Sequence, residues 1–137
     1  KPMDVARLVE MVGEATLKPP ILVVDDDPDF CRTMTRMLEM KGYRVYAAGS
    51  GGEALRVARE VVCPIAFIDV RMPEMDGIET YLALKEINPE LVPIMMTGYR
   101  EEMCQIIEKY TEAPAATCLY KPFNPSQVMQ LVSQFAD

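Results

Sequence analysis

The stretch Ile21-Leu22-Val23-Val24-Asp25-Asp26-Asp27 joins a short apolar run directly to three carboxylates. Three other short runs also end in a polar residue: residues 65–68 before Asp69, residues 94–96 before Thr97, and residues 118–120 before Lys121. Uninterrupted apolar runs of this length, separated by stretches with helical periodicity, are typical of parallel strands buried on both faces. We therefore predict a parallel sheet that gathers these polar residues at one edge.

The remaining sequence alternates between strand and helix patterns. A weakly alternating strand is predicted over residues 43–48. Capping residues and apolar stripes predict helices over residues 28–41, 51–61, 78–87, 101–110 and 125–135. Right-handed crossovers restrict five such units chiefly to a doubly wound α/β sheet flanked by helices. In the strand order 2-1-3-4-5, strands one and three lie side by side, so Asp25, Asp26 and Asp69 would crowd together.

The length and composition fit one domain. The chain has 137 residues, half of them hydrophobic, which is enough for one ordinary core. We expect a helical lead-in and linker over residues 1–19 and one domain over residues 20–137, although a helix at residues 4–12 that packs on its own domain is an open alternative. Because the chain begins at Lys1 rather than at Met, we also expect neighbouring domains in the natural protein.

Charge and apolar distribution argue against several classes of protein. The net charge of −7 disfavours direct nucleic-acid binding and suits metal cations or basic partners. No apolar stretch approaches the roughly 18 residues of a membrane span, and the first residues lack a signal-peptide region, so we expect a cytoplasmic protein without a membrane partner. Histidine is absent and the cysteines lack paired spacing, so we expect reduced, mostly buried thiols rather than a zinc cluster; they are Cys31, Cys63, Cys104 and Cys118.

The crowded carboxylates predict a cation site. Carboxylates this close repel one another, so a positive charge must compensate them. Magnesium is favoured because it prefers oxygen ligands, accepts one or two carboxylates and accommodates phosphate oxygens, and Lys121 can supply a second positive charge. Asp27 is better explained as the cap of the helix that follows it, whereas Asp25 and Asp26 precede that helix and are the predicted metal ligands.

Asp69 is the predicted centre of the chemistry. It ends a strand, opens towards a loop, and carries a carboxylate of the kind that can accept a phosphoryl group covalently. The Lys121 ammonium and the Thr97 hydroxyl could contact oxygens of that group. Alone, Thr97 would be satisfied by the backbone and Lys121 would be solvated. Their occurrence at successive strand ends favours one common site.

At these motifs the sequence resembles the receiver domain of two-component response regulators. The matching pieces are Val24-Asp25-Asp26-Asp27, Ile68-Asp69-Val70-Arg71-Met72-Pro73-Glu74-Met75-Asp76-Gly77, Met96-Thr97-Gly98-Tyr99 and Lys121-Pro122-Phe123. The resemblance covers residues 20–137 and implies a flavodoxin-like fold. It also implies that the domain switches its interaction surface when it is phosphorylated.

The resemblance assigns a role to each residue of the site. It implies that Asp69 takes a phosphoryl group from a phosphohistidine, with Mg²⁺ held by Asp26, Asp69 and the Arg71 backbone carbonyl. Asp25 would act through a metal-bound water. Thr97 and Lys121 would contact the phosphoryl oxygens, and the Lys121-Pro122 peptide would be cis.

The expected partners follow from what the chain lacks. Without histidine, the chain cannot supply its own phosphohistidine, so the donor must be a histidine kinase or phosphotransfer domain. The sequence Gly49-Ser50-Gly51-Gly52 has no lysine or phosphate motif, so ATP is not expected as a direct substrate. We expect a regulatory domain that assists its own phosphorylation and dephosphorylation, rather than an enzyme. A fused upstream kinase or effector domain and a phosphorylation-dependent dimer are compatible with this assignment.

Two features depart from the family pattern. Receivers usually carry an aromatic residue three positions before the lysine, and here that position is Cys118. A thiol cannot fill a ring-sized pocket, so the usual coupling to the output face is in doubt, and Tyr120 on the same side of the strand is a candidate substitute. The link between Thr97 and Lys121 is also longer than in many receivers, around residues 111–114.

Two other functions compete with this interpretation. A magnesium-dependent phosphohydrolase similar to the haloacid dehalogenase class would need an aspartate two residues after the nucleophile, where this chain has Arg71. A binding module that signals without phosphate is favoured by Cys118. It is opposed by the intact set of site residues, which are Asp25, Asp26, Asp69, Thr97 and Lys121.

Overall fold

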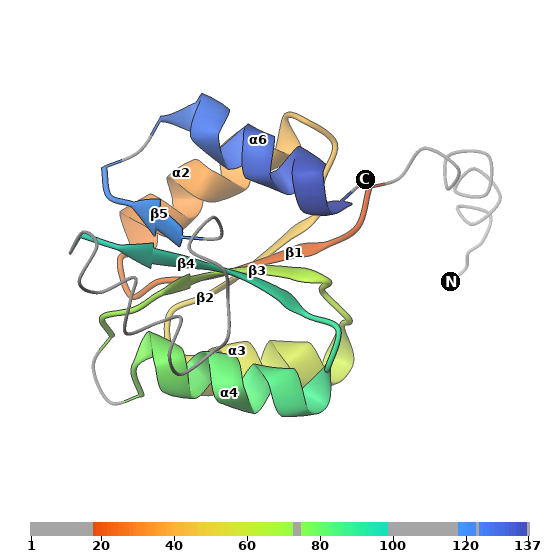
Figure 1. Ribbon diagram of the computed structural model, residues 1–137, viewed down its shortest axis with the longest axis vertical. Coiled ribbons are helices and arrows are strands. Elements are labelled where there is room, and N and C mark those ends of the chain that lie inside the picture. Colours follow the sequence, from red (N-terminus) through yellow and green to blue (C-terminus); the bar gives the residue numbers. More distant parts are fainter. Residues whose placement is uncertain (1–17, 73–74, 99–117, 123, 137) are drawn as a thin grey trace, which may run out of the picture.

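The computed structural model describes residues 18–72, 75–98, 118–122 and 124–136. Its centre is a five-stranded sheet of order β2-β1-β3-β4-β5, in which every neighbouring pair is parallel (Figure 1). The strands are β1 (Ile21–Val24), β2 (Val45–Ala48), β3 (Ile65–Asp69), β4 (Val92–Thr97) and β5 (Cys118–Tyr120). The described helices are α2 (Pro28–Glu39), α3 (Gly51–Glu60), α4 (Gly77–Ile87) and α6 (Pro125–Ala136). The predicted doubly wound, flavodoxin-like α/β fold is confirmed.

The sheet separates two layers of helices. Helices α3 and α4 cover one face, and α2 and α6 cover the other (Figure 1). Residues of β1 alternate between two apolar clusters: Leu22 and Val24 belong to the α3 and α4 side, whereas Ile21 and Val23 belong to the α2 and α6 side. This double burial explains why the central strands are uninterrupted apolar runs rather than alternating ones.

Side-chain caps fix where the helices begin. Asp27 accepts hydrogen bonds from two backbone amides at the start of α2, and Ser50 accepts one from Glu53 at the start of α3. The Asp27 cap was predicted. Asn124 and Gln127 bond reciprocally at the start of α6, as their spacing predicts. Asp76 and Glu79 form a further capping box at the start of α4, which was not predicted.

Two strands differ in extent from the prediction. Strand β2 begins at Val45 rather than at residue 43, because Tyr43 belongs to the turn after α2 and donates its amide to Leu38. Strand β4 begins two residues before the predicted run, because Val92 already bonds to the carbonyl of Pro64. The predicted helices at residues 4–12 and 101–110, and the long link at residues 111–114, lie outside the described residues.

Three of the four cysteines lie among the described residues. Cys31, Cys63 and Cys118 are buried, reduced cysteines, as expected, and Cys104 lies outside the described residues. Burial raises the pKa of both Cys31 and Cys63 to about 11, so these two remain protonated at neutral pH. Among the helices that the structure describes, none has the length and apolar character that crossing a bilayer requires.

Candidate functional site

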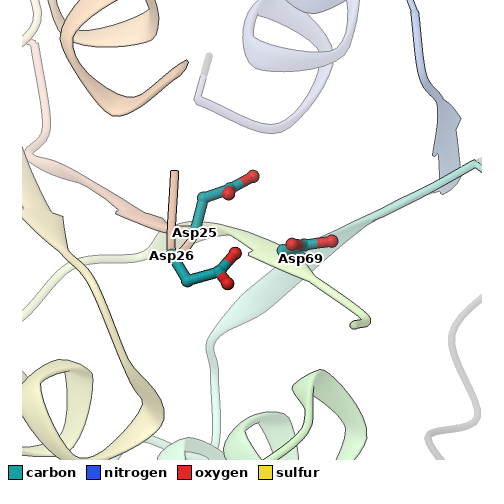
Figure 2. A group of neighbouring side chains, drawn as sticks. All are labelled: Asp25, Asp26 and Asp69. Atoms are coloured by element: carbon teal, nitrogen blue, oxygen red, sulfur yellow. The ribbon is translucent and has the colours of Figure 1, made fainter. Parts of the chain in front are cut away.

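Three carboxylates meet at the carboxyl edge of the two central strands. Asp25 and Asp26 follow β1 directly, and Asp69 is the last residue of β3. Because Val24 pairs with Ile68, the register places Asp25 beside Asp69. One carboxylate oxygen from each of the three residues lies within 4.8 Å of the others (Figure 2). The predicted acidic cluster is therefore present, with Asp25 and Asp69 buried and Asp26 exposed.

Asp25 is fixed on several sides. It is only 1% exposed, and its backbone amide donates to the carbonyl of Ala48 on β2. One carboxylate oxygen accepts the amide of Asp27 at 2.9 Å, and the other accepts the Lys121 ammonium at 2.6 Å. The thiol of Cys31 donates to its backbone carbonyl at 3.3 Å. These contacts hold the side chain in one orientation at the edge of the sheet.

Asp69 is less completely neutralised. Its Oδ1 accepts the Arg71 amide at 3.4 Å and lies 3.8 Å from the Lys121 ammonium. Burial, and then the negative charge of Asp25, raises the pKa of Asp69 to about 6, although Lys121 and the Arg71 amide act in the opposite direction. The carboxylate is thus ionised at neutral pH in a place that disfavours its charge, and an added cation would relieve that cost.

Lys121 lies between the two buried carboxylates. It follows β5, and its amide donates to the carbonyl of Thr97 at 2.7 Å, which extends the strand pairing by one residue. The peptide bond to Pro122 is cis, as the resemblance implies. The Lys121 ammonium also lies 4.4 Å from the centre of the Phe30 ring, on the first turn of α2. Strand pairing and helix packing together place this cation.

Thr97 ends the strand next to Asp69. Met96 is the register partner of Asp69, so Thr97 lies one residue further towards the same edge. The threonine is 2% exposed, and exposed Gly98 follows it. Of the predicted site residues, Asp25, Asp26, Asp69, Thr97 and Lys121 thus come from four strand ends and converge on one edge. The Arg71 backbone carbonyl remains a predicted ligand, and Arg71 itself is exposed.

Gly77 sets how closely α4 approaches the site. A side-chain carbon at this position would collide with the backbone carbonyl oxygen of Asp69. The Gly77 amide donates to the carbonyl of Val70 at 2.9 Å, so the first turn of α4 is tied to the chain that leaves β3. The helix was predicted to begin at residue 78, and the contact of Gly77 was not predicted, because a glycine alone does not indicate what approaches it.

The donor set fits a hard divalent cation. Three carboxylates from neighbouring strand ends offer oxygen atoms, and the anions outnumber the lysine that faces them. Magnesium prefers oxygen ligands and is held by few carboxylates, which is the chemistry available here. Asp27 is not a member of this set, because its carboxylate caps α2.

Two hollows border α2. One, of about 590 Å³, is lined mainly by apolar side chains of α2 together with Lys121, Pro122 and Pro125. The other, of about 700 Å³, lies between α2 and the loop before α3, and Asp25, Asp26, Arg32 and Arg36 contribute to its wall. The first hollow therefore reaches the site at Lys121, and the second reaches it at Asp25 and Asp26.

Comparisons with known proteins agree with this geometry. The family model described as the response regulator receiver domain matches residues 21–133. Transcriptional regulatory protein ZraR of Salmonella typhimurium is 35% identical over 114 residues, which are 83% of this chain and 25% of that protein. The CpxR homolog of Haemophilus influenzae, also a transcriptional regulatory protein, is 34% identical over 110 residues, or 80% of this chain and 46% of that protein.

A solved structure supports the same assignment. Chemotaxis protein CheY4 of Vibrio cholerae is similar with a TM-score of 0.78 and 27% identity, over 86% of this chain and 98% of that one. By contrast, the match spans only a quarter to about a half of the two transcriptional regulators. Since the family match covers most of the chain, and the strand order and acidic edge agree with it, the protein belongs to the response regulator receiver domain family of two-component systems.

Proposed function

We propose that Asp69 accepts a phosphoryl group from a phosphohistidine on a partner histidine kinase or phosphotransfer domain, and that this modification switches the surface of the domain. The observation that carries the proposal is the position of Asp69, a buried carboxylate beside Asp25, Asp26 and the Lys121 ammonium. A carboxylate that is ionised at neutral pH and faces a lysine has the charge and setting of a phosphoryl acceptor.

The proposed transfer is a substitution at phosphorus. A carboxylate oxygen of Asp69 attacks the phosphorus atom, a new O–P bond forms, and the P–N bond to the partner's imidazole breaks. The imidazole leaves with the electron pair of that bond and takes up a proton. In dephosphorylation, the oxygen of a water molecule attacks the same phosphorus atom. This step releases inorganic phosphate and restores the Asp69 carboxylate.

The proposed metal site consists of Asp25, Asp26, Asp69 and the Arg71 backbone carbonyl, with Asp25 acting through a bound water. Bound Mg²⁺ would supply positive charge that offsets the carboxylates and the charge of the transferred group. The fit is supported by three oxygen donors that approach within 4.8 Å of one another and by the raised pKa of Asp69.

Lys121 and Thr97 are the proposed contacts of the new phosphoryl oxygens. Lys121 can move from Asp25 towards Asp69, since its ammonium already lies 3.8 Å from Asp69 Oδ1. Thr97 would donate its hydroxyl from the neighbouring strand end. Phosphorylation adds about −1.5 to −2 charge to this edge, which draws both groups towards Asp69 and changes the loops that carry them.

The proposal describes a regulatory domain rather than an enzyme with a separate substrate. Its activity is confined to its own phosphorylation and dephosphorylation. We further propose a lead-in at residues 1–19 before the receiver at residues 20–137, and fusion to a kinase or effector segment in the whole protein. The second part is supported by ZraR and the CpxR homolog, both of which are much longer than the region matched here.

Intact-mass measurement after incubation with Mg²⁺ and acetyl phosphate tests the acceptor. We expect the wild type to gain the mass of one phosphoryl group and Asp69→Asn to gain none. Asp27→Asn is the matched control, because Asp27 belongs to the same acidic run but caps α2, and it should still be modified. Modification that persists in Asp69→Asn would overturn the assignment. Steady release of phosphate from a generic monoester would instead favour the phosphohydrolase alternative.

A further inference from the structure

The Lys121 ammonium has an aromatic neighbour in addition to its two carboxylates. Its distances are 2.6 Å to Asp25 Oδ2, 3.8 Å to Asp69 Oδ1 and 4.4 Å to the centre of the Phe30 ring. A cation within about 6 Å of an aromatic ring centre, over its face, is attracted by the ring quadrupole. The first neighbour follows β1, the second ends β3 and the third lies on α2, so three separate parts of the fold contact the lysine.

The Phe30 ring is itself held in place. Phe30 lies in the first turn of α2, where Pro28 is at the start of the helix and the Asp27 carboxylate accepts the amides of Asp29 and Phe30. The side chain is partly buried and packs against the apolar cluster on the α2 and α6 side of the sheet. A ring anchored in this way offers the lysine a fixed surface.

The proposed reaction requires the Lys121 ammonium to stay near Asp69, and the Phe30 ring can help to keep it there. Lysine is a flexible chain with a strongly hydrated end, and the Lys121 side chain is 29% exposed, so it can leave the site for solvent. The carboxylate of Asp25 holds the ammonium at one point, nearer to itself than to Asp69. A ring face attracts the cation over a broader area, so the ammonium can shift between Asp25 and Asp69 while it remains in contact with the ring.

We propose that Phe30 is a positioning residue for the reaction at Asp69, because its ring face keeps the Lys121 ammonium beside the acceptor while that ammonium moves from Asp25 to the phosphoryl oxygens. The inference rests on the proposed function of Asp69 and Lys121. Phe30 lies on α2. In the proposed reaction it contacts neither the phosphorus nor the oxygen atoms of the metal site, and it acts only through Lys121.

Ring electronics separate this role from simple packing. Phe30→Leu keeps apolar bulk but removes the ring face, and it should slow phosphorylation by acetyl phosphate about three- to tenfold. Phe30→Tyr retains the face and should stay near the wild-type rate. Replacement of Phe30 by phenylalanines with one, two and then several ring fluorines changes the shape little but progressively weakens the attraction for a cation. The maximal rate of phosphorylation by acetyl phosphate should fall steadily as fluorines are added.

The decisive control is the same fluorine series in Lys121→Met. That background has no ammonium, so the dependence on ring fluorination should vanish there. A flat series with the native lysine, or an equal slope with methionine, would overturn the proposal, because packing alone would then account for the effect of Phe30.

A second measurement does not require phosphorylation. Protons on the carbon next to the Lys121 ammonium should have resonances shifted upfield by the Phe30 ring current, and the shift should disappear in Phe30→Leu. Absence of that shift in the wild type would sink the proposal even if Asp69 is modified. A wild-type chain that shows the shift but gains no phosphoryl mass would instead contradict the proposed function, and with it the positioning role.

Discussion

Thr97 and Tyr120 are register partners on the neighbouring parallel strands β4 and β5. Partners of this kind project from the same face of a sheet. Cys118, two residues before Tyr120, pairs with Met95 and is buried with it in the cluster on the α3 and α4 side. Tyr120 is 37% exposed. A partly exposed aromatic side chain therefore lies on the strand next to Thr97, and Tyr120 remains the candidate substitute for the aromatic residue that is missing at position 118.

We predict that Tyr120 senses the phosphorylation of Asp69 through Thr97. With 3-fluorotyrosine at position 120, the fluorine resonance should move when acetyl phosphate and Mg²⁺ are added. Thr97→Val keeps the shape but removes the hydroxyl and should abolish this movement, whereas Thr97→Ser should retain it. A resonance that moves equally in Thr97→Val would show that the two residues are not coupled. Unchanged partner binding by phosphorylated Tyr120→Ala would remove Tyr120 from the output.

We predict that Asp69→Asn stabilises the metal-free domain at neutral pH. The folded-state pKa of Asp69 is about 6 against an ordinary 3.8, so between these values the folded state binds the proton more tightly than the unfolded state. Ionisation of Asp69 therefore lowers the free energy of unfolding as pH rises through this window, and the loss is complete above pH 6. The advantage of Asp69→Asn should grow by about 2 kcal/mol across the same range.

Urea unfolding in a chelator at pH 4 and pH 7.5 would measure that difference. Asp27→Asn again provides a control, since it changes an exposed cap rather than a buried carboxylate. An advantage of Asp69→Asn that is equal at the two pH values would contradict the assigned cause.

Lys121→Ala should destabilise the domain and uncouple it from its output. The substitution leaves the Asp25 carboxylate, which is almost fully buried, without the ammonium at 2.6 Å, and we expect a loss of about 2 kcal/mol at pH 7. Asp25→Asn in the same chain should restore part of the loss, because an amide needs no counter-charge. Some phosphorylation should persist, but equal partner affinity of the phosphorylated wild type and Lys121→Ala would contradict the switching role.

Two adjacent glycines at the start of α3 should respond oppositely to alanine. A side-chain carbon at Gly51 would lie 2.5 Å from the Thr80 hydroxyl oxygen and 2.7 Å from the Met75 sulfur, so Gly51→Ala should cost about 1–3 kcal/mol. At Gly52 such a carbon would meet no atom within 4 Å, and Gly52→Ala should stabilise the helix by about 0.5–1 kcal/mol. Thermal unfolding of the two variants is the test, and equal shifts would contradict the packing argument.

The sequence predicts the centre of the fold better than its edges. Residues 21–24 and 65–68 are apolar without interruption because helices cover both faces, whereas a strand with one face in water would alternate with polar residues. Tyr43 was assigned to a strand because an aromatic residue suits both a strand and a packed turn. The start of β4 was missed because Pro93 breaks the apolar pattern, although its carbonyl side can still join the sheet.

Some residues of the site could be predicted from local sequence, and others could not. Asp25, Asp26, Asp69, Thr97 and Lys121 were found because each follows an apolar run, a signal that is local in sequence. Phe30 lies within the helix predicted over residues 28–41, and no local signal marks it as part of the site. Its place against Lys121 depends on how α2 packs on the sheet, which no local pattern encodes. The contact of Gly77 with the Asp69 backbone was missed for the same reason.

The order of the strands has a consequence for synthesis on the ribosome. The acidic residues of the edge follow β1 and end β3, whereas the lysine that faces them follows β5, the last strand of the described sheet in sequence order. If the central strands pair as soon as they leave the ribosome, Asp25 and Asp69 come together before Lys121 has emerged. Strand β5 thus brings the cation that balances the carboxylates of this edge, and the paired central strands should gain stability once β5 has left the exit tunnel.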